Sequence, residues 1–455
     1  MSLTSMPPAS APPASARSGS IEGMARVAPE AFFVVSGQVV GALGNIFAIR
    51  ILTTLLPPAG YGQLALAMTG AVLAQQLVFG PIGTACIRYF APAQESGELA
   101  TYTRAIARMF LAGTLALGLI AALIAIFFAG TARLNLLPSL AAAGAFAWLS
   151  SANSMIDGIQ NAARQRMSVA LHQGVGAWLR LGIVVVVARY LTQNANSILW
   201  SYSAGYALLI LSQVFFLQRT LRRMGLGRRE ETHSTNPILR SMWTYAWPFS
   251  AWGVFTWIQA SSDRWALGAF AGLDQVGLYQ SLYQIGYYPI AMLTQFLLQV
   301  STPIVFQRAG SGADSRRRMN AEGLNNLLTR VVLGATAVGA LASYLGGHRL
   351  LALVLAPAYR AHSPLISLLI LASGCFAAGQ IKSLNFMTSL ATHRLIAPKV
   401  VTALAGAGLI VLGARYRGSY GVASAQLAFS MLYLAWIFLL DRKHSVLRSI
   451  PAEAV

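Results

Sequence analysis

Apolar stretches of about 20 residues recur along almost the whole chain, and no other feature limits its fold as strongly. A helix of about 20 apolar residues spans the hydrocarbon core of a bilayer. Of the 455 residues, 56% are hydrophobic and only 10% are charged, whereas soluble domains carry about 25% charged residues. We therefore predict an all-α, polytopic membrane protein. Twelve transmembrane helices are expected, over residues 31–54, 61–87, 106–129, 138–162, 168–189, 196–217, 243–268, 276–305, 328–347, 363–390, 396–414 and 418–440.

The basic residues between these spans predict the orientation of the chain. With the N-terminus inside, 23 Lys and Arg residues fall in the cytoplasmic loops and tails, and six fall outside. Cytoplasmic loops of membrane proteins carry such an excess, so both termini are expected in the cytoplasm. The net charge of +20 therefore reflects topology. It does not indicate a nucleic-acid partner, because no module with interleaved arginine and aromatic residues is present.

The longest cytoplasmic loop divides the spans into six and six, as in transporters built from internal repeats. The expected organisation is a disordered cytoplasmic tail (1–29), a six-helix bundle (30–217), a basic linker (218–242), a second six-helix bundle (243–440) and a cytoplasmic tail (441–455). The first tail is rich in Pro, Ala and Ser and lacks the apolar core of a signal peptide. A faint echo relates the halves: Arg50 precedes Tyr61-Gly62, and Arg264 precedes Gly277 and Tyr279 at similar spacing.

No pattern of an enzyme is found. There is no GxxxxGK[ST] loop and no convincing Ser/His/Asp or Cys/His set. Cys86 and Cys375 lie in apolar runs, and the six His lack the spacing of metal ligands. We expect no enzymatic activity, no metal and no cofactor, and we expect gradient-driven or passive transport.

Charged residues inside the spans are the strongest functional signal. Such a charge costs about 2.5–3.5 kcal/mol on insertion scales, so it is seldom kept without a use. Four cations lie there, against only two carboxylates, and this excess indicates an anionic substrate. The candidate substrate-binding cations are Arg50, Arg180, Arg264 and Lys382, and the candidates for ion pairing or ion coupling are Asp157 and Asp263.

Alternatives remain open for five of these six residues. Arg180 lies about 18 Å inside its span at 1.5 Å per residue, which strains a snorkelling side chain. Arg50 and Lys382 can snorkel to the interface. Asp263 and Arg264 can act as interfacial anchors. Asp157 can pair with Arg164, seven residues further on, or lie in the headgroup zone.

The eighth span carries amides and tyrosines at helical spacing. Amides bond sugar hydroxyls, and aromatic rings stack on the apolar faces of sugars, so this face suits a sugar. The alternative is an interfacial aromatic belt with amides that bond neighbouring helices. The candidate sugar-contacting residues are Gln280, Gln284, Gln295, Tyr283 and Tyr287. In the first span, Gly37 and Gly41 form a small face that predicts close helix packing.

Three segments resemble one known family. They are AIRILTTLLPPAGYGQLALA (48–67), SDRWALGAFAGLDQVGLYQSLYQI (262–285) and RLLALVLAPAYRAHSPLISLLILA (349–372). In order and spacing they are similar to segments of the polysaccharide flippases. These belong to the superfamily that also holds drug/cation antiporters and lipid II flippases. In the third segment Ala356-Pro357 stands where the family usually has a Gly before the Tyr-bearing turn.

The resemblance implies two bundles around a V-shaped central cavity and transport by alternating access. It implies export of undecaprenyl-pyrophosphate-linked oligosaccharide across the bacterial inner membrane, for O-antigen, capsule or exopolysaccharide. The partners would be this lipid-linked oligosaccharide, membrane lipids, and a polymerase or other assembly proteins, with H⁺ or Na⁺ as the ion of any coupling. Cavity cations would bind the pyrophosphate.

Two other functions are weighed against this one. A multidrug antiporter of the same superfamily would be expected to carry a deep Asp in the first span, where only Glu30 stands, at the edge. A membrane glycosyltransferase or ligase usually needs a sizeable outer loop, and every predicted outer loop is short.

Overall fold

The computed structural model describes residues 36–129, 136–224, 234–309, 315–360, 362–388 and 391–449, and these residues contain helices and no strand. The first helix is Ser36–Leu55. It is followed by α2 (Pro58–Ala74), the π-helix η1 (Gln75–Phe79), α3 (Gly80–Glu95), α4 (Leu99–Ala129), α5 (Leu136–Ala162), α6 (Arg166–Tyr190), α7 (Ala195–Arg223), α8 (Asn236–Phe270), α9 (Leu273–Gly286), α10 (Tyr288–Ala309), α11 (Ser315–Val354), the 3₁₀ turn η2 (Pro357–Tyr359), α12 (Leu365–Lys382), α13 (Leu384–Thr388), the 3₁₀ turn η3 (Thr392–Leu395) and α14 (Ile396–Ser449).

The twelve predicted spans each correspond to one helical stretch, so the predicted fold class is confirmed. Within the described residues, nine stretches are long and apolar enough to cross a membrane. α5 and α8 add two more, whose polar residues lower their hydropathy. The twelfth arises because α14 is two helices that meet at Gly418, which has φ 55° and ψ −136°.

The segment boundaries differ from the prediction in several places. The ninth predicted span ends at residue 347, but α11 continues to Val354 and η2 follows. The described parts of the predicted linker, 218–242, extend α7 and begin α8, and residues 441–449 continue α14. The predicted tail over 1–29 lies outside the described residues.

Two spans are interrupted at prolines. The second span contains η1 immediately before Gly80-Pro81, where the proline has no N–H for the helical ladder. The eighth span breaks at Tyr287, between α9 and α10. Pro289 is the second residue of α10. The predicted column of amides and tyrosines is therefore divided between two helices and does not form one continuous face.

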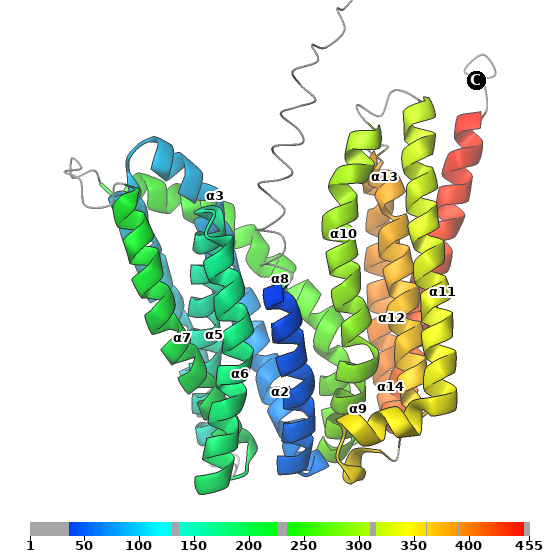
Figure 1. The fold of residues 1–455 in the computed structure, drawn as a ribbon, viewed down its shortest axis with the longest axis horizontal. Coiled ribbons are helices and arrows are strands. Elements are labelled where there is room, and N and C mark those ends of the chain that lie inside the picture. The colour runs from blue at the N-terminus through cyan, green and yellow to red at the C-terminus, as the bar shows by residue number, and fades with distance from the viewer. Residues whose placement is uncertain are drawn as a thin grey trace, which may run out of the picture.

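The helices form two groups that diverge toward the end at which α14 finishes, giving a V (Figure 1). The opposite end holds the turns at Leu56, Ala271 and Gly418; we call it the outer end, after the predicted orientation. One apolar core is shared by both groups at the outer end and includes Leu56, Leu267 and Tyr359. Toward the other end the cores are separate: one joins α3, α4, α5 and α7 with the start of α8, and another joins α12, α13 and α14.

α8 belongs to both groups. Its first part packs on α3 and its last part on α14. A Cβ at Gly253 would lie 2.6 Å from the Gln76 carbonyl oxygen, so α8 contacts the backbone of η1 directly. The Tyr89 hydroxyl donates to the Ser241 carbonyl at 3.2 Å.

The first helix packs closely on α6 through its small face. A Cβ at Gly37 would lie 2.5 Å from the Ala170 carbonyl oxygen, and one at Gly44 would lie 2.9 Å from the Ala177 Cβ. Trp178 Nε1 donates to the Val40 carbonyl at 3.1 Å. The packing predicted from Gly37 and Gly41 is confirmed.

Candidate functional site

The two halves touch backbone to backbone where α2 crosses α9 at the outer end. A Cβ at Gly62 would lie 2.0 Å from the Leu273 carbonyl oxygen, and one at Gly277 would lie 1.9 Å from the Pro58 carbonyl oxygen. Real Cβ atoms do not approach so closely, so only glycine fits at either position. Gly62 and Gly277 are the glycines of the sequence echo, and the halves therefore meet through corresponding elements.

Hydrogen bonds at and beside this crossing also join the two halves. The Tyr61 hydroxyl donates to Gln284 Oε1 at 2.9 Å, and the Tyr359 hydroxyl donates to the Leu56 carbonyl at 2.7 Å. The rings of Tyr61 and Tyr359 meet edge to face, with centroids 5.9 Å apart. We call Arg50, Leu56, Tyr61, Gly62, Gly277, Gln284, Leu355 and Tyr359 the outer seal. Gln284, predicted to contact sugar, lies in this seal.

Arg50 also belongs to the outer seal. Its Nη1 donates to the carbonyls of Ala352, at 3.4 Å, and Leu355, at the end of α11. Arg360 donates to the same two carbonyls at 3.0–3.1 Å. The end of a helix carries partial negative charge, which cations stabilise. Arg50 therefore ties the first helix to the C-terminal half, whereas Arg360 acts within that half.

Replacing Arg50 by methionine is expected to loosen the outer seal, because hydrogen bonds to a charged group contribute about 1.5–3 kcal/mol. A cysteine at Leu56, which is 3% exposed, would react faster with an impermeant maleimide added from outside. Arg360→Met is the matched control, since it removes a guanidinium from the same carbonyls without removing a hydrogen bond between the halves. Equal labelling of the two variants would contradict this role for Arg50.

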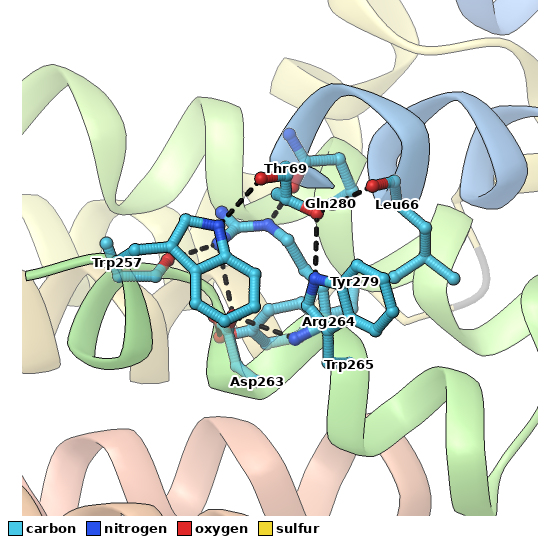
Figure 2. Close-up of polar contacts among 9 residues, drawn as sticks. Leu66, Thr69, Trp257, Asp263, Arg264, Trp265, Tyr279 and Gln280 are labelled. Carbon is cyan, nitrogen blue, oxygen red and sulfur yellow. Dashed lines mark hydrogen bonds and ion pairs between the residues drawn. The ribbon is translucent and has the colours of Figure 1, made fainter. Parts of the chain in front are cut away.

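Arg264 lies at the centre of a buried network (Figure 2). Its Nη1 contacts Asp263 Oδ1 at 3.1 Å and donates to the Ala260 carbonyl at 2.6 Å, and its Nε donates to Gln280 Oε1. The Tyr279 hydroxyl donates to Asp263 Oδ2 at 2.9 Å. Asp263 and Arg264 are 4% and 5% exposed, so they form a neutral, hydrogen-bonded pair inside the C-terminal half.

The same network includes two of the predicted sugar-contacting tyrosines. The Arg264 guanidinium lies 4.2 Å from the centroid of the Tyr283 ring, and that ring stacks on Tyr287 at 4.6 Å. Trp257 and Trp265 fix the adjoining part of α8 to α2, since both donate to Thr69, at 2.7 and 3.1 Å. A role of Tyr283, Tyr287 or Gln280 toward a substrate stays a prediction.

Lys382 is neutralised within the C-terminal half. Its Nζ lies 2.8 Å from Asp441 Oδ2 and donates to Asn326 Oδ1. Asn385 Nδ2 donates to Asp441 Oδ1 at 3.1 Å. Asp441 was not considered as a partner, because the sequence prediction placed it in the C-terminal tail. The apolar stretch before Asp441 is long, and this length could have been used to predict that the last helix reaches Asp441.

Arg180 differs from the other three cations. Its guanidinium lies 4.5 Å from the centroid of the Tyr206 ring, and its stem packs on Gly205, where a Cβ would lie 2.6 Å from Arg180 Cγ. Tyr206 packs against the shared outer core. Within the described part of the chain, Arg180 has no carboxylate partner and no hydrogen bond. It is about 21 Å along α6 from Arg166, near the middle of this predicted membrane-spanning helix.

Asp157 is held by amides and not by Arg164. Its Oδ1 accepts from Gln213 at 2.7 Å, and its Oδ2 accepts from Asn153 at 3.3 Å and Gln173 at 3.4 Å. Arg164 is exposed and occupies the turn after α5 with φ 59°. Of the alternatives open for Asp157, pairing with Arg164 is not observed, because the turn carries Arg164 away and α7 supplies the donor Gln213.

Several amides on the first helix, α8 and α10 are exposed at membrane depth. None of them has a hydrogen-bond partner among the described residues, although amides in hydrocarbon need one. They are Gln38, Asn45, Gln259, Gln295 and Gln299. The predicted sugar contact Gln295 is among them, and Gln259 is a further amide of the same kind on α8.

These features define a class of protein: a multi-pass membrane transporter fold, closed at one end by paired halves and diverging at the other. The family model described as "Polysaccharide biosynthesis protein" matches residues 27–308. This is more than half of the chain, and the chain belongs to that family. Among curated protein sequences, none matches the chain.

Solved structures share the fold. A multidrug resistance MATE family transporter in an inward-facing conformation aligns with TM-score 0.64 and 15% identity, over 90% of this chain and 96% of that one. Lipid II flippase MurJ, in an inward closed conformation, aligns with TM-score 0.65 and 12% identity, over 91% and 87%. A MOP superfamily transporter from Pyrococcus furiosus aligns with TM-score 0.56 and 17% identity, over 92% and 95%. The family expected from the sequence is confirmed by the family model, and these structures show which fold the chain has.

Proposed function

We propose that this protein moves an undecaprenyl-pyrophosphate-linked oligosaccharide across the bacterial inner membrane, for assembly of a cell-surface polysaccharide. Both termini would lie in the cytoplasm, and the protein would be a transporter, not an enzyme. Membership of the polysaccharide biosynthesis family supports the substrate class. The divergence of the halves toward the cytoplasmic end suits entry of a lipid-linked sugar from that side.

The uncompensated charge of Arg180 carries the proposal. Arg264 is balanced by Asp263, and Lys382 is balanced by Asp441. Arg50 is hydrogen-bonded to helix-end carbonyls. A guanidinium at mid-membrane without an anion stays energetically costly until one arrives. A pyrophosphate offers the planar oxygen pairs that guanidinium binds best.

The unpartnered amides fit the rest of the substrate. An oligosaccharide presents many hydroxyls, which both donate and accept hydrogen bonds as a carboxamide does. Unpartnered amides on several helices would form hydrogen bonds with successive sugars. They would not require one fixed geometry of the oligosaccharide. The lipid tail would stay in the bilayer, where the exposed apolar residues of the outer helix faces already lie.

Replacing Arg180 by glutamine is expected to lower polysaccharide output about tenfold or more, at equal protein level. Loss of charge-assisted hydrogen bonds weakens the binding of an anion by about 1.5–3 kcal/mol, which is a factor of ten or more in affinity. Lipid-linked oligosaccharide should accumulate on the inner face of the membrane, where an added glycosidase reaches it in inverted vesicles.

Arg189→Gln is the matched control, because Arg189 is an exposed arginine near the end of the same helix. Unchanged output in Arg180→Gln would remove Arg180 from the pathway. Unchanged sidedness of the lipid-linked oligosaccharide after gene deletion, together with raised drug sensitivity, would overturn the flippase function in favour of a drug antiporter.

A further inference from the structure

The N-terminal half holds a buried carboxylate that the proposed anion pathway does not use. Asp157 is 9% exposed, and its donors are the neutral amides of Gln213, Asn153 and Gln173. No Lys or Arg among the described residues forms an ion pair with it. A buried charge is stable only when an opposite charge balances it, so the site lacks one positive charge.

Two acceptor oxygens on neighbouring glutamines have no donor. Gln160 and Gln213 are 0% and 1% exposed, and the Oε1 atom of each is buried without a hydrogen-bond partner. Such orphaned acceptors are rare inside proteins and indicate an unseen partner. Gln160 stands three residues after Asp157, on the same face of α5.

Hydrogen bonds connect Asp157, Gln160 and Gln213 into one cluster, in which Gln160 bonds the backbone of Gln213. Gln213 Nε2 donates to Asp157 Oδ1 at 2.7 Å, and Gln160 Nε2 donates to the Gln213 carbonyl at 3.3 Å. The cluster therefore holds one carboxylate and two carboxamides between α5 and α7, and the Oε1 atom of each carboxamide is left to accept. Asp157 lies about 8 Å from the cytoplasmic end of α5 at 1.5 Å per residue, so an ion from the cytoplasm has a short path to it.

We propose that Asp157, Gln160 and Gln213 form a binding site for one monovalent metal cation of the size of Na⁺. The site offers hard oxygen ligands and a single negative charge, which one monovalent ion neutralises. A divalent ion such as Ca²⁺ recruits several carboxylates. No three His, Cys, Asp or Glu residues gather within the described chain, so the site is not one for a transition metal.

The neighbouring histidine is not a ligand. His172 Nδ1 lies 2.7 Å from the Ser168 carbonyl, and its Nε2 lies 3.0 Å from the Ser212 hydroxyl. These two oxygens engage both ring nitrogens, so neither nitrogen is free to bind an ion. The ion of the proposed site would join α5 to α7.

The test is direct binding of radioactive sodium to the purified full-length protein in lipid nanodiscs, without oligosaccharide. Wild-type protein is expected to bind about one Na⁺ saturably, with no competition by choline. Asp157→Asn should weaken binding about tenfold or more. Asp274→Asn is the control, since Asp274 is an exposed carboxylate in the first turn of α9 and should bind as wild type does.

A second variant keeps the test decisive if Asp157→Asn folds poorly. Gln213→Glu adds a second carboxylate, so Ca²⁺ should now compete with sodium better than it does in wild type. Sodium binding at the level of empty nanodiscs, or equal binding in Asp157→Asn, would overturn the site. So would proton uptake at the cluster with no sodium retained. No substrate is present, so failure of this site and failure of the proposed flippase function are separate outcomes.

Discussion

Replacing Arg264 by alanine is expected to destabilise the folded protein by about 3–5 kcal/mol, the usual cost of removing one partner of a buried ion pair. Asp263, 4% exposed, would keep its charge with only the Tyr279 hydroxyl and its neighbour's backbone N–H as donors. Gln280 would lose its donor, and Tyr283 would lose the cation over its ring. The measurement is thermal unfolding in detergent, together with the amount of protein in the membrane.

A double variant separates the lost charge balance from lost packing. Asp263→Asn with Arg264→Gln removes both charges and keeps a polar side chain at each position, so most of the stability should return. Replacing a whole buried pair is often nearly neutral. A double variant as unstable as Arg264→Ala would mean that the shape of the guanidinium, and not its charge, holds α8 to α9.

The transmembrane spans could be predicted from sequence because their signal is local. An apolar run of about 20 residues has few alternatives to a membrane helix, and the small face at Gly37 and Gly41 needed only one helix to be recognised. The break at Tyr287 also had a local cause, in Pro289. The amides before and after the break were nevertheless assigned to one face, because a single helix was assumed across it.

The partners of the charged residues could not be predicted, because they come from distant parts of the chain. Arg50 bonds a carbonyl 305 residues away, and no spacing rule addresses a backbone oxygen. Gln213, 56 residues from Asp157, is nearer to it than the local candidate Arg164. The sequence showed that four cations lie within the predicted spans. Only the fold shows that three of them already have an ion-pair or hydrogen-bond partner.

Introducing a single methyl group at Gly277 is expected to open the outer seal. In Gly277→Ala the new Cβ would lie 1.9 Å from the Pro58 carbonyl oxygen and 2.9 Å from the Gly62 nitrogen, so α2 and α9 must separate by more than 1 Å. Overpacking of this kind costs about 1–3 kcal/mol, which changes a two-state equilibrium by roughly 5- to 150-fold. The Tyr61–Gln284 bond joins these same two helices and would lengthen with their separation. The Arg50–Leu355 bond joins the same two halves through the first helix and the end of α11, and would weaken as the halves part.

The consequence is a protein that folds but no longer holds its outer end closed. Maleimide labelling at Leu56→Cys should rise about tenfold, and polysaccharide output should fall at equal protein level. Gly118→Ala in α4 is the matched control, because nothing lies within 4 Å of the new Cβ and alanine favours a helix over glycine. If Gly277→Ala labels and exports as Gly118→Ala does, the helices can part without breaking the seal, and another contact must hold this end closed.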